Sequence, residues 1–124
     1  INRSDTSTAY RIVAYGDSIF AGYTNATTVC RRAAPLVAGE YCAALTGQNW
    51  NIARRCQSGA VASGIYNRIN SATDRAFMQD PSTRIVTFEM CGNDYLQARS
   101  SFRSSTGTCN YTGLTNAGNN CRTY

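Results

Sequence analysis

The sequence predicts an α/β protein built around a parallel sheet, because short apolar runs alternate with segments of helical periodicity. The runs at 11–15, 49–54 and 84–90 are rich in β-branched and aromatic residues, as buried strands are. Two segments with apolar residues at helical spacing, 33–46 and 63–79, separate them. Strands joined by helices of this length form right-handed crossovers, so neighbouring strands run parallel. We expect about three strands and two helices in this chain.

The ends of the expected elements carry stop signals. The first strand ends at Gly16, and the first helix has Pro35 near its start and Gly47 just beyond its end. The second helix stops at Asp80-Pro81, because the residue before a proline disfavours the helical conformation.

The segment from about residue 100 to Tyr124 differs in kind from the rest. It is rich in Ser, Thr, Asn and Gly, lacks apolar periodicity and contains Cys109 and Cys121. We therefore expect a loop stapled by these two cysteines. A three-stranded parallel sheet also leaves an edge and an apolar surface that no further strand or helix of this sequence covers. We expect residues 1–124 to be the N-terminal part of a single domain.

Composition favours a globular protein from an oxidising compartment. The 124 residues are 43% hydrophobic, and no apolar run approaches the roughly 18 residues of a membrane span, so we expect no transmembrane segment. The six cysteines form no C-x-x-C pair, which favours three disulfides over a zinc site and predicts secretion. Three N-x-S/T sequons are candidate glycosylation sites, at Asn2, Asn25 and Asn110.

The basic residues argue against a nucleic-acid partner. The net charge is +5, and all 12 basic residues are arginines spread from Arg3 to Arg122. A nucleic-acid-binding protein usually gathers its cations on one face or tail. Scattered charges are typical of a solvated surface instead.

Each expected strand is followed by a turn of small and polar residues. The turns are Gly16-Asp17-Ser18, Gln57-Ser58-Gly59-Ala60 and Gly92-Asn93-Asp94. Ligands of an open parallel sheet bind outside the carboxyl ends of its strands, so these turns should converge on one site.

The chemistry that suits this arrangement is acyl transfer. The Ser18 hydroxyl would project from a tight strand-to-helix turn as a nucleophile. Its own N–H, the Gly59 N–H and the Asn93 side-chain amide would face a developing oxyanion. Phe20 and Tyr23, just past the nucleophile, could line an acyl or sugar pocket. This chemistry needs no metal and no organic cofactor.

The same turns carry a family resemblance. AYGDSIFAGYT (14–24) resembles the first sequence block of the SGNH (GDSL-type) hydrolases, CQSGAVASG (56–64) the second and FEMCGNDYL (88–96) the third. The resemblance covers roughly residues 10–99 and implies a flavodoxin-like three-layer α/β/α fold that acts on ester bonds. It would make Ser18 the nucleophile, with Gly59 and Asn93 completing the oxyanion hole.

The cysteine-bearing segments are similar to those of secreted lipases and esterases of that family. The similarity implies a lipid or another acylated small molecule as the ester substrate. It also implies three disulfides, which we expect to be Cys30–Cys56, Cys42–Cys91 and Cys109–Cys121.

The fourth block of the family, an Asp-x-x-His near the C-terminus, has no match, and the chain contains no histidine. Without an imidazole the serine hydroxyl stays protonated, and loss of a triad member costs about three to six orders of magnitude in rate. This chain alone should be nearly inactive. We expect proteolytic cleavage after Tyr124 and a second, associated polypeptide that supplies the catalytic Asp and His.

Two other functions remain open. The chain could be a non-catalytic module that uses a hydrolase-like pocket to bind a carbohydrate or lipid. It could also be a small disulfide-rich basic protein that binds anionic surfaces, in which case binding would weaken with salt and survive Ser18→Ala.

Overall fold

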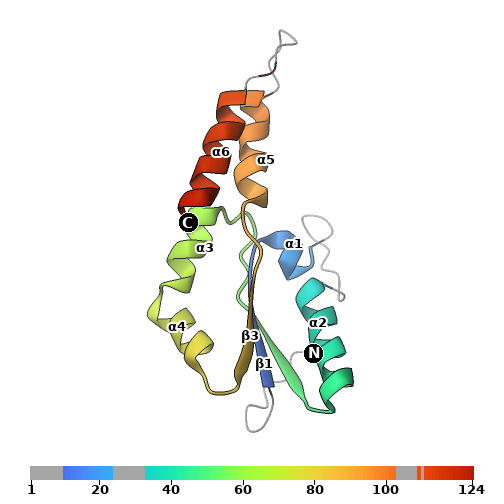
Figure 1. The fold of residues 1–124 in the computed structure, drawn as a ribbon. Helices are drawn as coiled ribbons and strands as arrows, with labels where there is room; N and C mark the ends of the chain where they lie inside the picture. Colours follow the sequence, from blue (N-terminus) through green and yellow to red (C-terminus); the bar gives the residue numbers. More distant parts are fainter. Residues whose placement is uncertain (1–9, 24–32, 103–108, 110) are drawn as a thin grey trace.

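The computed structural model describes residues 10–23, 33–102, 109 and 111–124. Its centre is a sheet of parallel strands in the order β2-β1-β3, formed by β1 (Tyr10–Tyr15), β2 (Trp50–Arg54) and β3 (Thr83–Phe88) (Figure 1). In the middle strand, Ile12 pairs with Ile52 on one side and Ile85 on the other. The three expected strands and their parallel arrangement are confirmed.

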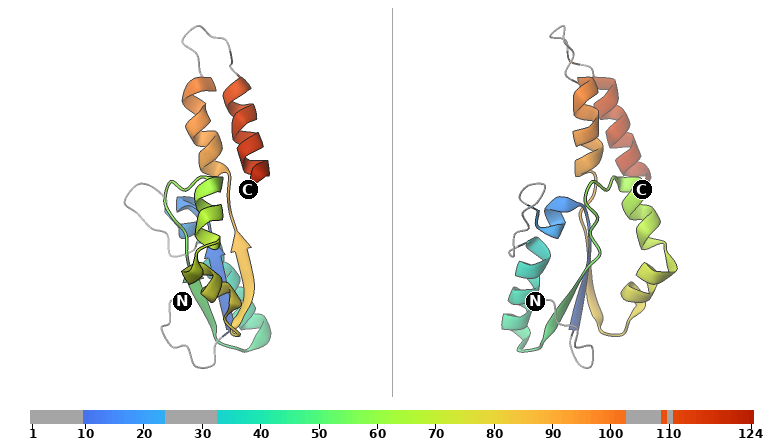
Figure 2. Two further views of the ribbon diagram at one scale, coloured as in Figure 1. Left: turned by 90° about the vertical axis from the view of Figure 1, so that its left-hand side faces the viewer. Right: turned by 180° about the vertical axis from the view of Figure 1, so that it is seen from behind.

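Helices cover both faces of this sheet (Figures 1 and 2). α2 (Ala34–Thr46) lies on one face, and α3 (Ala62–Ile69) and α4 (Ala72–Gln79) lie on the other. Successive side chains of a strand point in opposite directions. Ile12 of β1 therefore joins a core cluster with α2, while Val13 joins a second cluster with Ile65 of α3. The α/β/α arrangement that the family resemblance implies is confirmed.

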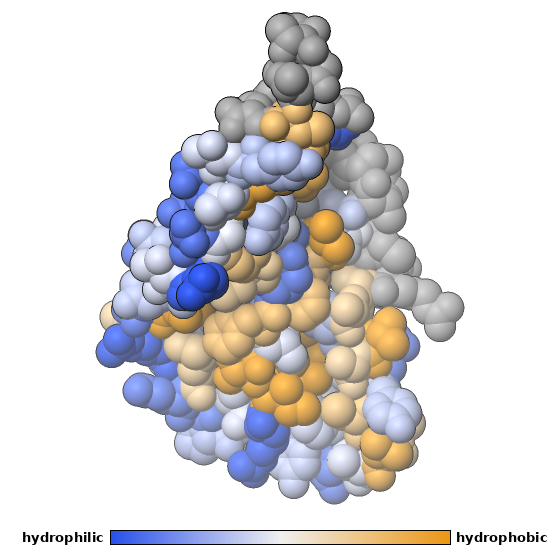
Figure 3. Space-filling model, turned by 45° about the horizontal axis from the view of Figure 1, so that its top comes forward, coloured by the Kyte–Doolittle hydropathy of each residue, from blue (hydrophilic) through white to orange (hydrophobic). Residues whose placement is uncertain are grey.

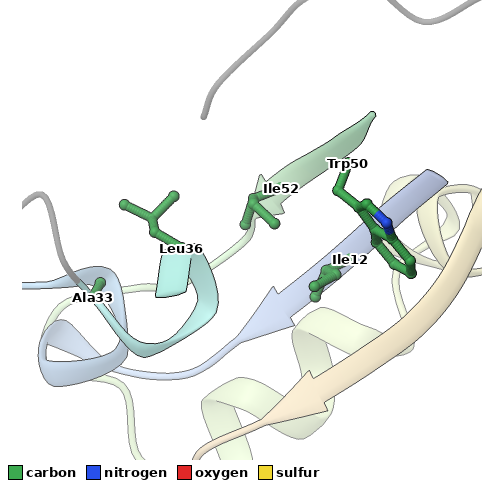
Figure 4. Close-up of a cluster of buried hydrophobic side chains, with 5 residues drawn as sticks. All are labelled: Ile12, Ala33, Leu36, Trp50 and Ile52. Atoms are coloured by element: carbon green, nitrogen blue, oxygen red, sulfur yellow. The ribbon is translucent and has the colours of Figure 1, made fainter. Parts of the chain in front are cut away.

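The core between α2 and the sheet is a compact apolar cluster. Its buried members are Ile12, Ala33, Leu36, Trp50 and Ile52 (Figure 4). The indole N–H of Trp50 donates to Thr46 Oγ1 at 2.9 Å, so its polar end is satisfied. α2 has the expected proline in its first turn and ends at Gly47, whose φ of 64° is left-handed.

The segment predicted as one helix over 63–79 forms two helices. α3 ends at Asn70, whose side-chain amide donates to Tyr66 O at 2.9 Å. Ser71 then caps α4, because its hydroxyl accepts the Asp74 N–H at 3.2 Å. Local side-chain hydrogen bonds of this kind compete with a continuous helix, which explains the break.

The prediction of a loop for the tail is wrong for residues 111–123. α5 (Gly92–Phe102) and α6 (Tyr111–Thr123) form a pair of helices that projects beyond the carboxyl ends of the strands (Figure 2). Ala117 of α6 is 5% exposed, and Gly118 lies against the Tyr95 hydroxyl of α5. Packing of this face stabilises a helix that its Gly and Asn content disfavours.

Two of the expected disulfides are wrong. Cys91 pairs with Cys121, because α6 returns beside α5 and brings the two Cα atoms to 5.6 Å. The expected Cys42–Cys91 and Cys109–Cys121 pairs therefore do not form. The Cys42 thiol is free and packs beside the α2-side core, and the Cys109 thiol is free and exposed.

Several expectations concern residues outside the described part of the chain. Cys30, the expected partner of Cys56, is one of them, and Cys56 has a free thiol in the structure. The three sequons at Asn2, Asn25 and Asn110 also lie outside the described residues. Within the described residues, no helix combines the length and the hydropathy that crossing a membrane requires.

Candidate active site

The first of the three turns follows β1 and opens a one-turn helix, α1 (Ser18–Ala21). Asp17 caps this helix by accepting the Ile19 N–H on Oδ1 at 2.7 Å, and only 2% of its surface is exposed. Gly16 allows the chain to turn here, because a side chain on it would start 2.7 Å from Phe20 Cβ. Ser18 therefore stands half-buried at the carboxyl edge of the central strand.

The second turn follows β2 and is held against the first. The Gln57 N–H donates to Gly16 O at 2.8 Å, and the Ala60 N–H closes the turn on Gln57 O at 3.1 Å. Gly59 is exposed and has a φ of 75°, while open space surrounds the position that its Cβ would take. The glycine is thus required by the left-handed backbone, not by crowding.

The third turn follows β3 and begins α5. Cys91, the residue of the disulfide to α6, has a φ of 80°, which is uncommon for a residue with a side chain. Asn93 uses both N–H groups of its side chain: one donates to Asp17 Oδ2 at 2.9 Å and the other to Ala60 O at 3.0 Å. Asp94 Oδ2 accepts the Ala62 N–H at 2.9 Å at the start of α3.

The structure thus brings together the turns that carry Ser18, Gly59 and Asn93. Asn93 bonds to the neighbour of Ser18 on one side and to the neighbour of Gly59 on the other. A nucleophile and several N–H donors at one edge of a sheet can act together on a carbonyl group.

Sequence reasoning missed Glu89, which directly follows β3. Its N–H donates to Tyr15 O at 2.9 Å, and its Oε2 accepts the Asp17 N–H at 3.0 Å. Burial raises the pKa of Glu89 above its ordinary value; the Asp17 N–H opposes this shift, while the hydrogen bond with the Asp17 side chain and its negative charge add to it. The available signal was a lone acid near the end of the apolar run 84–90.

The two aromatic residues expected to line a pocket lie in different surroundings. Tyr23 lines a pocket of about 430 Å³ beside β2, together with Arg54 and Cys56. Phe20 packs against Gly16 and is not among the residues that line this pocket. Burial raises the pKa of the Cys56 thiol to about 11, so this group is not a thiolate at neutral pH.

No three His, Cys, Asp or Glu side chains of the described residues gather as a metal site would require. The acidic side chains of the site, Asp17 and Glu89, instead accept hydrogen bonds from backbone and amide N–H donors.

The model of the GDSL-like lipase/acylhydrolase family matches residues 12–117, a span that contains all three turns. The chain belongs to this family. Comparison with curated proteins finds no match. The family membership agrees with the resemblance that the three sequence blocks carry.

Solved structures of lipases and esterases share the fold. A lipase from a goat rumen metagenome, Lip_vut3, superposes with a TM-score of 0.73 at 17% identity over 93% of this chain and 51% of its own. AlinE4, an esterase of the SGNH-hydrolase family, superposes with a TM-score of 0.54 at 25% identity over 75% of this chain and 46% of its own. This chain spans about half the length of these structures.

Proposed function

We propose that this chain provides the nucleophile and oxyanion site of a secreted ester hydrolase. The observation that carries the proposal is the Asn93 amide, which joins the turn of Ser18 to the turn of Gly59. Family membership supports the reaction class. The Cys91–Cys121 disulfide supports an oxidising compartment and hence secretion.

In the proposed reaction, Ser18 Oγ attacks the ester carbonyl carbon and its proton passes to a histidine. The oxyanion accepts hydrogen bonds from the N–H groups of Ser18 and Gly59 and from the Asn93 amide. Because both Asn93 N–H groups bond to protein acceptors in the structure, the oxyanion takes over one of these donors. Collapse of the intermediate returns the proton to the alcohol that leaves, and water then hydrolyses the acyl-enzyme.

The histidine and its orienting Asp come from outside these 124 residues, on a second polypeptide that stays associated. The support for this part of the proposal is the absence of histidine from the sequence, together with the half-length match to the lipase and esterase structures. The substrate is a lipid or another acyl ester, and the pocket that Tyr23 lines offers space for part of it.

Hydrolysis of p-nitrophenyl esters with short and long acyl chains tests this function in the protein as isolated. Ser18→Ala should lower kcat by about three to six orders of magnitude. Thr73→Ala, which removes an exposed hydroxyl on α4, should leave kcat unchanged. Full activity of the Ser18 variant would remove this residue from the role of nucleophile.

A further inference from the structure

The nucleophile turn rests on two neighbouring carboxyl groups: Asp17 is buried and Glu89 is half-buried. Asp17 is 2% exposed, and its two oxygens accept the Ile19 N–H and the Asn93 amide. Glu89 Oε2 accepts the Asp17 N–H at 3.0 Å, and the neighbouring Asp17 side chain contributes to the raised pKa of Glu89. Glu89, the residue after β3, therefore contacts the backbone of the residue that precedes Ser18 and lies beside its side chain.

The two turns that enclose this pair leave room for it because they contain glycine. A side chain on Gly16 would start 3.1 Å from Glu89 Oε2. A side chain on Gly92 would start 3.3 Å from Asp17 Oδ2 and 3.4 Å from Glu89 Oε1. The pair is thus packed between the nucleophile turn and the turn that carries Asn93.

Two neighbouring carboxyl groups that are partly withdrawn from water do not both ionise readily, because like charges repel more strongly where water is excluded. Asp17 accepts hydrogen bonds from two donors on its oxygens, and Glu89 accepts the Asp17 N–H. Burial, together with the neighbouring Asp17 side chain, raises the pKa of Glu89, so Glu89 retains its proton to a higher pH than a free glutamate does.

We propose that Glu89 is a positioning residue that, in its protonated form, holds Asp17 and thereby sets both Ser18 and Asn93 for the reaction. This inference rests on the proposed function. Deprotonation of Glu89 places two negative charges side by side. Their repulsion displaces Asp17, which positions both the turn of Ser18 and the amide of Asn93.

Few other titratable groups face Glu89 among the described residues. Asp17 belongs to the β1–α1 turn, and the Cys56 thiol, which interacts electrostatically with both carboxyl groups, follows β2. Arg54 and Arg68 act on the same thiol. Because the pKa of Cys56 lies at about 11, Cys56 stays neutral while Glu89 titrates.

The test compares Glu89→Gln and Glu89→Ala in the protein as isolated. Gln has an oxygen for the Asp17 N–H and an N–H for the Asp17 carboxylate, so it reproduces the protonated acid at every pH. Glu89→Ala should lower kcat by about 10²-fold with KM nearly unchanged, since small displacements of reacting groups cost this much. Glu89→Gln should retain kcat within about threefold at the acidic side of the profile.

The pH profile separates positioning from a merely structural role. The ratio of Glu89→Gln to wild-type kcat should rise with pH, because only the wild type loses the proton; titration of the base cancels in this ratio. Glu40→Gln, an exposed change on α2, should give a flat ratio. Three results would overturn the inference. They are a ratio for Glu89→Gln that does not change with pH, a loss of kcat in Glu89→Gln as large as in Glu89→Ala, and full activity of a folded Glu89→Ala variant.

Thermal unfolding keeps the two proposals distinguishable. A raised pKa in the folded state means that stability is fully present below the unfolded pKa of Glu89 and falls as pH rises through the folded pKa. As pH rises over this range, the Tm of the wild type should fall relative to the Tm of Glu89→Gln. If no ester is hydrolysed, the proposed function fails, and this comparison still decides whether Glu89 holds the proton; equal pH dependence of both proteins would contradict it.

Discussion

At the scale of single residues, the site is organised by hydrogen bonds of Asp17 and Asn93. Asp17 is nearly buried and fixes the helix that begins with Ser18. Asn93 joins this residue to the second turn through two N–H donors. Each of these side chains thus links segments that are far apart in the sequence. A substitution at either residue should therefore lower the reactivity of Ser18, although Ser18 itself is unchanged.

Asn93→Ala should lower kcat for an activated ester by about 10²–10³-fold, which corresponds to about 2.7–4 kcal/mol, because it removes an oxyanion donor. KM should change far less, since the donor acts mainly in the transition state. Asn67→Ala removes an exposed amide on α3 and is the matched control. A loss below about threefold for Asn93→Ala would exclude it as an oxyanion donor.

At the scale of elements, an ion pair between Asp74 of α4 and Arg55, the residue after β2, holds α4 beside the sheet. Asp74 is 2% exposed; its Oδ1 accepts from Arg55 Nε at 2.6 Å and its Oδ2 from Ser71 Oγ at 3.0 Å. The Tyr15 hydroxyl of β1 donates to Asp74 O at 3.2 Å, and burial first, then Asp74, raises the pKa of Tyr15 to about 12. A strand, a loop and a helix therefore meet at one residue.

Asp74→Ala should lower the free energy of unfolding by about 3 kcal/mol at neutral pH, because it leaves a partly buried arginine without its partner. Glu40→Ala, an exposed change, should cost less than about 0.5 kcal/mol. Burial alone would raise the pKa of Asp74, but the hydrogen bonds from Arg55 and Ser71 outweigh it and lower the pKa.

The Arg55–Asp74 ion pair also predicts how the stability of the protein changes at acidic pH. A lowered pKa contributes stability above the unfolded pKa of Asp, about 3.9, and this contribution is lost as pH falls through the folded pKa. The Tm difference between wild type and Asp74→Ala should therefore narrow from pH 7 to pH 3. A difference that stays constant would show that the ion pair does not cause it.

The Cys91–Cys121 disulfide anchors the end of α6 to the turn that begins α5. It closes a chain segment with a sequence separation of 30, for which loop-closure entropy gives about 3–4 kcal/mol. Cys121→Ser should lower stability to unfolding by this amount, measured by denaturant titration. Cys109→Ser replaces an exposed free thiol and should change little; equal stability of wild type and Cys121→Ser would contradict the account.

The sequence predicts the strands and α2 well, because their signals are local: β-branched runs, a proline at the start and a glycine at the end. It predicts the place of Ser18, Gly59 and Asn93 because parallel strands end at one edge. It fails for α6, whose helix depends on contacts with α5, and for the disulfide that follows from them. It also fails for Glu89, whose proximity to Asp17 depends on the pairing of β3 with β1.

At the scale of the whole molecule, one face carries a broad patch of hydrophobic residues (Figure 3). Among the described residues, Phe88 of β3 is 49% exposed and Leu96 of α5 is 57% exposed. Apolar residues that gather on one exposed face are a feature of interaction sites. It agrees with the proposal that a second polypeptide completes both the fold and the catalytic triad.

One measurement tests the central claim most directly: mass spectrometry of the isolated protein under reducing, denaturing conditions after reaction with a fluorophosphonate. The account predicts a label on the peptide that contains Ser18 and a second polypeptide that contains an Asp-x-x-His sequence. A protein of residues 1–124 alone that takes up no label, or a label on another residue, would contradict the claim that Ser18 is a nucleophile activated by a histidine from outside this chain.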